Sequence, residues 1–167
     1  MTFLDVPAPP DWDLVGKGES VPARSAKYAS LIEVLLDYDS LLVGYWYPEV
    51  HQGAHGSLRV SLRDEETSYA RALQERKTEP YVDFTDVLEY ECWEQEIPAG
   101  RVIGTSALLK DCEENLFSLS VTADVFFGGS PQAFTFEFIT SSLQHAEAFR
   151  TSVSDIVWQT RSAELSQ

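Results

Sequence analysis

Apolar and polar residues alternate most regularly in the second half of the chain. From residue 117 to 125 an apolar side chain occupies every second position, with Ser, Thr or Asp between them. After a Gly-Gly-Ser-Pro segment at 128–131, Phe134, Phe136 and Phe138 repeat the pattern. A period of two residues is typical of a strand with one face in the core. The two segments therefore predict a hairpin with an aromatic inner face.

Earlier parts of the chain also predict strands. The segment 58–62 alternates Leu and Val with Arg and Ser, which indicates a half-buried strand. The segments 41–47, 87–97 and 102–109 are rich in apolar residues and are bounded by Pro, Gly or polar turn residues. We therefore expect an antiparallel sheet of about five to seven strands.

Two segments predict helices by their ends and their apolar stripes. Acids open the segment 64–77 and bases close it, which complements the helix macrodipole. Ser141 and Gln144 form a capping-box pattern at the start of a C-terminal helix over about 141–160. The apolar residues of that helix recur at helical spacing, so one of its faces packs on the sheet.

The segment from Tyr28 to Leu36 fits two interpretations. Its apolar residues fall on one helical face, namely Tyr28, Leu31, Ile32, Leu35 and Leu36. A strand would place Ala29, Leu31 and Glu33 together, which is poor alternation. Periodicity favours the helix, and the strand stays open.

These elements predict an α+β fold in which helices, including the C-terminal one, pack on one face of the antiparallel sheet. The length of 167 residues suits a single domain, 1–167. Residues 1–23 are rich in Pro and Gly and predict an irregular N-terminal arm, or a short edge strand around Trp12 that pins the arm to the core. The polar tail, 161–167, is expected to fray.

The order of these segments resembles the PsbP-like superfamily, which includes PsbP, DcrB and LpqN proteins and Eag-type chaperones. The resemblance covers about residues 8–160 and is one of pattern, carried by Pro10-Asp11-Trp12, Tyr28-Ala29-Ser30-Leu31-Ile32, the segment 58–77, the aromatic strand 134–140 and the stripe Phe149, Val153, Ile156 and Val157. It implies a non-catalytic binder or accessory subunit, and a strand over Tyr28–Val34. No residue-level motif of function carries over.

Charge restricts the class of partner. The chain has 27 acids against 12 bases, a formal net charge of −15. Phosphates repel such a surface, so neither nucleic acid nor an anionic membrane is expected as a partner. A basic protein or peptide is compatible, because a folded surface of one sign attracts the other. The charge also fits a role in solubility alone.

The acids are concentrated in one stretch. Between Thr78 and Gly100 lie seven acids and no base. In the predicted strand 87–97, Glu89 and Glu91 share one parity, and Glu94 and Glu96 share the other. A bulge near Cys92-Trp93 would bring all four to a common outward face. The predicted partner-binding residues are these four acids, with Trp93 or Trp46 as an apolar anchor: Glu89, Glu91, Trp93, Glu94, Glu96 and Trp46.

Candidate catalytic chemistry is sparse. His51 and His55 lie four residues apart, which on a helix suits one metal ion, but Pro48, Gly53 and Gly56 indicate a loop. A solvated loop is the favoured interpretation, with a small metal-dependent hydrolase as the alternative. No catalytic residue and no cofactor is expected.

Cys92 and Cys112 are too few for a disulfide scaffold, so free buried thiols are expected, although pairing between neighbouring strands stays open. The first residues have neither the basic nor the apolar region of a signal peptide, and no lipid-anchor cysteine is evident. A cytoplasmic location follows as an expectation.

The sequence thus predicts a non-enzymatic, acidic protein-binding module that steers a basic partner. An immunity protein for a toxin and an accessory chaperone of secretion both fit. A continuous acidic patch would favour the first, and an apolar cleft rimmed by acids the second. The alternatives are the metal-dependent hydrolase and a structural or ligand-binding accessory subunit. Composition does not indicate the oligomeric state.

Overall fold

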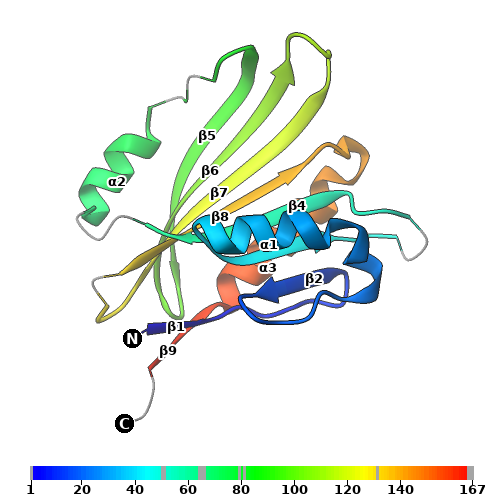
Figure 1. Ribbon diagram of the computed structural model, residues 1–167. Helices are drawn as coiled ribbons and strands as arrows, with labels where there is room; N and C mark the ends of the chain where they lie inside the picture. Colours follow the sequence, from blue (N-terminus) through cyan, green and yellow to red (C-terminus); the bar gives the residue numbers. More distant parts are fainter. Residues whose placement is uncertain are drawn as a thin grey trace.

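The computed structural model describes residues 2–49, 52–63, 67–78, 80, 82–130 and 132–164. Its main feature is a seven-stranded antiparallel sheet with the strand order β2-β3-β4-β8-β7-β6-β5 (Figure 1). In that order the strands are Trp12–Gly16, Ser40–Trp46, Gly56–Leu62, Ala133–Thr140, Phe117–Phe127, Gly100–Asp111 and Thr85–Ile97. The predicted α+β class, strand number and antiparallel arrangement are confirmed.

In the described part of the chain, three α-helices accompany the sheet: α1 (Ala29–Tyr38), α2 (Tyr69–Arg76) and α3 (Ala146–Gln159). Short 3₁₀ turns, η1 (Ala23–Tyr28) and η2 (Leu143–His145), lead into α1 and α3. Ser68 caps α2, because its hydroxyl accepts a hydrogen bond from the Arg71 backbone N–H. The predicted C-terminal helix is confirmed as α3, which follows the short turn η2. The acids expected to open the second helix, Asp64 to Glu66, lie outside the described residues.

The helices lie on both faces of the sheet, which corrects the expectation of a single helical face. α3 packs on the face that carries Trp46, Val60 and the three alternating Phe residues of β8. α1 packs on the opposite face, where Ile32 and Leu36 meet Val43 and Tyr45 of β3. Figure 1 shows α1 and α3 on opposite sides of the sheet. The consecutive residues Tyr45, Trp46 and Tyr47 are all buried because both faces are covered there.

The segment that fitted two interpretations is helical. Tyr28 ends η1, and Ala29 to Tyr38 form α1, with Ile32 and Leu36 facing the core. The helical period was therefore the correct signal. The strand over Tyr28–Val34 implied by the PsbP-like resemblance is wrong for this chain.

The two ends of the chain are more ordered than expected. Trp12 is buried in β2, an edge strand as predicted, and its indole N–H donates to Ser152 Oγ of α3 at 2.6 Å. Residues 161–164, expected to fray, form β9 (Arg161–Glu164), which pairs antiparallel with β1 (Thr2–Asp5). The arm is thus not irregular throughout, and residues 165–167 lie outside the described part.

Both cysteines are free. Cys92 lies on β5 opposite Thr105 of β6, whereas Cys112 follows the far end of β6. The two thiols are therefore too far apart along the hairpin to pair. Cys92 is half-buried and Cys112 is exposed, so neither is the buried thiol that was expected. Among the described residues, no helix combines the length and apolar character needed to cross a membrane.

Candidate functional site

The candidate site is built on β5, the last strand of the sheet. Among the described strands β5 pairs with β6 alone, so its other side is a free edge. It is 13 residues long, whereas β2 at the opposite edge has five. A long free edge presents unpaired backbone N–H and C=O groups, so β5 needs either protection or a partner.

The strand contains a bulge, but not where the charge pattern placed it. The pairing of β5 with β6 shifts between Val87 and Glu89, and from Glu89 to Ile97 it is regular. The expected bulge near Cys92-Trp93 is therefore wrong. Because the alternation is unbroken, the four acids do not share a face. Glu89 and Glu91 lie on the α3 side of the sheet, and Glu94 and Glu96 on the α2 side.

Trp93 follows the first pair of acids on the α3 side. It pairs in register with Gly104 of β6, and its indole lies over that glycine. A Cβ placed on residue 104 would stand 2.0 Å from Cζ2 of Trp93, which no side chain tolerates. Glycine thus leaves the space that the indole fills. Trp93 is half-buried, packs against the main core and leaves one side accessible.

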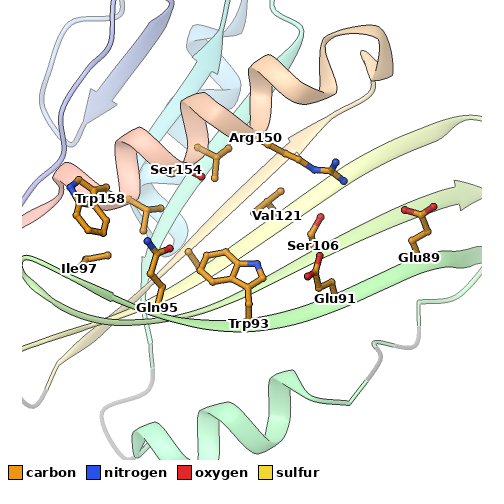
Figure 2. A pocket seen from close by; sticks show the side chains of 13 residues that line it. Glu89, Glu91, Trp93, Gln95, Ile97, Ser106, Val121, Arg150, Ser154 and Trp158 are labelled. Carbon is orange, nitrogen blue, oxygen red and sulfur yellow. The ribbon is translucent and has the colours of Figure 1, made fainter.

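The opposite wall of the site is one face of α3. Arg150, Ser154 and Trp158 are spaced by four residues, so they project from the same side of the helix. Val153 and Val157 lie beside them and face the core. Figure 2 shows these side chains on α3 across from Trp93 and the acids of β5.

Between the two walls lies a cleft of about 480 Å³. Val121 and Ala123 of β7 form part of its apolar base, and Ile97 and Trp158 close one end. Glu89, Glu91 and Arg150 lie towards the other end, next to Ser106 (Figure 2). Among the described residues Arg150 forms no ion pair. The cleft can therefore hold an apolar group at one end and a charged group at the other.

Glu94, on the α2 side, has protein partners. Glu94 accepts a hydrogen bond from the Tyr69 hydroxyl at 2.7 Å and lies 3.6 Å from the Arg101 guanidinium. Arg101 also stacks over the Tyr69 ring at 3.8 Å. Burial, together with the hydrogen bond to Glu94, raises the pKa of Tyr69 to about 12. Glu94 therefore holds α2 to the sheet, in contrast to the acids of the cleft.

Trp46 is not available as an anchor. Its side chain is 1% exposed, its ring packs against Trp12 and Phe149, and its indole N–H donates to Asp11 Oδ2 at 2.7 Å. Trp46 is therefore wrong as the alternative anchor, because α3 and the N-terminal arm cover that face. Of the six predicted contact residues, the structure brings together Glu89, Glu91 and Trp93.

Of the predicted histidine pair, the structure describes His55. His51 lies outside the described residues. His55 lies in the loop before β4, as expected, with Nδ1 3.0 Å from Ser142 Oγ. The same hydroxyl is 2.9 Å from Nδ1 of His145, whose Nε2 lies 3.0 Å from Glu49. No three His, Cys, Asp or Glu side chains in the described part of the chain are placed to hold a metal ion.

Three contributors to the cleft were not foreseen: Arg150, Ser154 and Trp158. Their spacing of four residues on the predicted C-terminal helix was the available signal. That spacing shows that they share a helical face, but not that this face overhangs β5. The position of α3 relative to β5 depends on how Phe149 and Ile156 pack in the core.

Comparison with known proteins supports a relation in fold. No family model matched the chain, and no curated protein matched its sequence. The crystal structure of LpqN, involved in cell envelope biogenesis of Mycobacterium tuberculosis, is similar with a TM-score of 0.59. The two chains are 12% identical over 98% of this chain and 85% of LpqN. At that identity the likeness shows a fold shared with LpqN and carries no residue of function.

Proposed function

We propose that this protein is a non-enzymatic accessory module that binds a basic segment of another protein in the cleft between α3 and β5. One observation carries the proposal: Glu89 and Glu91 lie in the same cleft as the half-buried indole of Trp93. A lysine or arginine of the partner would lie against the carboxylates. An apolar residue beside it would bury against the indole and the base of the cleft.

The charge of the whole molecule supports the same class of partner. A net charge of −15 attracts a basic chain over distances longer than the cleft and raises the rate of encounter. The apolar base then supplies contact area that charge alone does not. Binding should therefore have a salt-dependent association rate and a dissociation rate set by the aromatic contact.

The form of the cleft favours an accessory chaperone over an immunity protein. Its base is apolar, and Glu89, Glu91 and Arg150 lie at one end of its rim, whereas a toxin-neutralising surface would be expected to present acid continuously. The relation in fold to LpqN, a protein of cell envelope biogenesis, is compatible with an accessory role. The location of this chain in the cell stays a prediction.

The test uses two fluorescein-labelled peptide probes. One contains lysines interspersed with valines, and the other carries glutamate in place of each lysine. Association rates are measured at low and high salt with the wild type and with the double variant Glu89→Gln/Glu91→Gln. We expect the variant to bind the lysine probe roughly two- to tenfold more weakly, with a flatter salt dependence.

A matched control lies on α1, on the opposite face of the sheet. Glu33→Gln/Asp37→Asn removes the same charge from two exposed positions and should leave affinity for the lysine probe within about twofold. Equal losses of affinity in both variants would mean that the acids act only through the overall negative charge of the protein. The cleft would then not be the binding site. Equal binding of the lysine and glutamate probes would contradict the proposal outright.

A further inference from the structure

The cleft does not use the outward-facing backbone of β5, which is an edge strand of the sheet. Along 13 residues, every second N–H and C=O of β5 faces away from β6, its one partner among the described strands. Edge strands are commonly protected by short length, Pro, bulges, covering elements or charged side chains. β5 has its bulge at one end only and contains no Pro, and from Glu89 to Ile97 its ladder is regular.

The side chains of β5 select what can pair with this edge. Five acids and no base lie within the strand: Asp86, Glu89, Glu91, Glu94 and Glu96. Directly opposed residues on neighbouring strands share a face and lie close together, so opposite charges attract and like charges repel. If a second copy of this chain paired along this edge, its acids would lie opposite the acids of β5 and would repel them. In a basic strand, the bases would lie opposite these acids and would attract them.

The spacing of the acids sets a pattern for the partner. Glu89 and Glu91 lie on the α3 side, and Glu94 and Glu96 on the α2 side. A strand added in register meets all four when its bases stand at its first, third, sixth and eighth positions. This spacing is the same in both chain directions, so it serves a parallel or an antiparallel partner. Strict alternation of bases meets only two of the acids.

We propose that an extended basic segment of a partner protein adds to the sheet as an eighth strand beside β5. It carries Lys or Arg at the first, third, sixth and eighth of eight consecutive positions. This inference rests on the proposed function and names the mode of binding. The added strand extends the floor of the cleft past Trp93. Its fifth residue lies beside the accessible side of the indole in a parallel strand, and its fourth residue does so in an antiparallel strand. Glu94, already bonded to Tyr69, contributes least of the four acids.

The test compares two peptides of identical composition. The first is acetyl-Lys-Thr-Lys-Val-Val-Lys-Thr-Lys-amide, which has the required spacing. The second is acetyl-Lys-Thr-Lys-Val-Lys-Val-Lys-Thr-amide, in which the lysines alternate strictly. Both peptides have the same charge, so attraction to the overall negative charge of the protein would give them equal affinities. Strand addition predicts that the first peptide binds at least about threefold more tightly.

Backbone pairing is tested by N-methylation of the first peptide, at its odd positions in one version and at its even positions in the other. An added strand pairs with β5 through alternate N–H groups, so one version should lose binding at least about tenfold while the other keeps it. Two versions that behave alike, whether both bind or neither does, overturn strand addition. Amide exchange gives an independent readout, since alternate amides between Glu89 and Glu96 should slow on binding.

The outcomes separate this inference from the function on which it rests. If both peptides bind with equal affinity, and Glu89→Gln/Glu91→Gln weakens both, then the cleft binds basic chains through side chains only and strand addition is wrong. If neither peptide shows salt-dependent binding that the double variant weakens, the proposed function fails as well. If the peptides induce dimers of this chain, a second copy occupies the edge and the inference is overturned.

Discussion

The indole of Trp93 lies over Gly104 of the neighbouring strand, where any side chain would collide with it. This contact holds the indole at the base of the cleft with one side accessible. It also places the ring beside Glu91, which lies two residues earlier on the same face of β5. The cleft thus depends on the absence of a side chain at residue 104 as well as on the residues that line it.

Gly104→Ala should displace Trp93 and spoil the cleft. The new methyl group would stand 2.0 Å from Cζ2 of the indole, so the ring must move, at a cost of about 1–3 kcal/mol in unfolding free energy. We expect a change in tryptophan fluorescence and weaker binding of the lysine probe. Gly128→Ala is the control, because a Cβ there meets nothing closer than 3.9 Å. An unchanged spectrum in Gly104→Ala would mean that Trp93 lies elsewhere.

Asp124→Asn should destabilise the fold strongly. The carboxylate is fully buried and accepts hydrogen bonds from Arg63, Arg76 and Thr135 at 2.7–3.0 Å. Removing its charge leaves the Arg76 guanidinium without its carboxylate partner and Arg63 with Glu75 alone, at a cost of about 3–5 kcal/mol by urea unfolding. Asp155→Asn, the same change at an exposed position of α3, should alter stability by less than about 0.5 kcal/mol. Similar midpoints for the two variants would refute this role.

Tyr69 should make stability depend on pH in the alkaline range. Its pKa is raised from 10.0 to about 12, so the folded state favours the neutral phenol. Its contribution is fully present below pH 10 and is lost as the pH rises towards 12. The stability difference between wild type and Tyr69→Phe should therefore shrink over that interval. A stability difference that stays constant between pH 10 and pH 12 would contradict this role of Tyr69.

Ser142 should contribute to stability through its two histidine neighbours. Its hydroxyl lies within 3.0 Å of Nδ1 of both His55 and His145, joining the loop before β4 to the start of α3. Ser142→Ala leaves both imidazoles without that partner and should cost about 1–3 kcal/mol in thermal or urea unfolding. Ser141→Ala changes an exposed neighbour and should have little effect. Equal effects of the two substitutions would assign the loss to the turn itself.

Much of the sheet could be predicted because a strand with one buried face has a period of two. The alternation of Phe134, Phe136 and Phe138 against polar residues indicated both the strand and its inner face. The helix over Ala29–Tyr38 was indicated by its own period. Helices on both faces were not predicted, although the uninterrupted apolar run Tyr45-Trp46-Tyr47 was the signal for it.

The cleft could be predicted only in part. The acids and Trp93 stand out in the sequence by charge and size. Their distribution over the two faces depends on where β5 bulges against β6, and alternation within one strand does not fix that position. Trp46 and Trp93 both face the α3 side of the sheet, and α3 together with Trp12 of the N-terminal arm covers Trp46 and leaves Trp93 half-buried. The path of α3 also brings Arg150 into the cleft.

The most direct test is an NMR titration of the ¹⁵N-labelled protein with acetyl-Lys-Thr-Lys-Val-Val-Lys-Thr-Lys-amide. We predict that the largest shift changes fall on the backbone of residues 89–97 and on the indole N–H groups of Trp93 and Trp158, and that they diminish at high salt. Shift changes concentrated on α1, or spread evenly over all acidic residues, would contradict the account that β5 and the cleft beside it form the binding site.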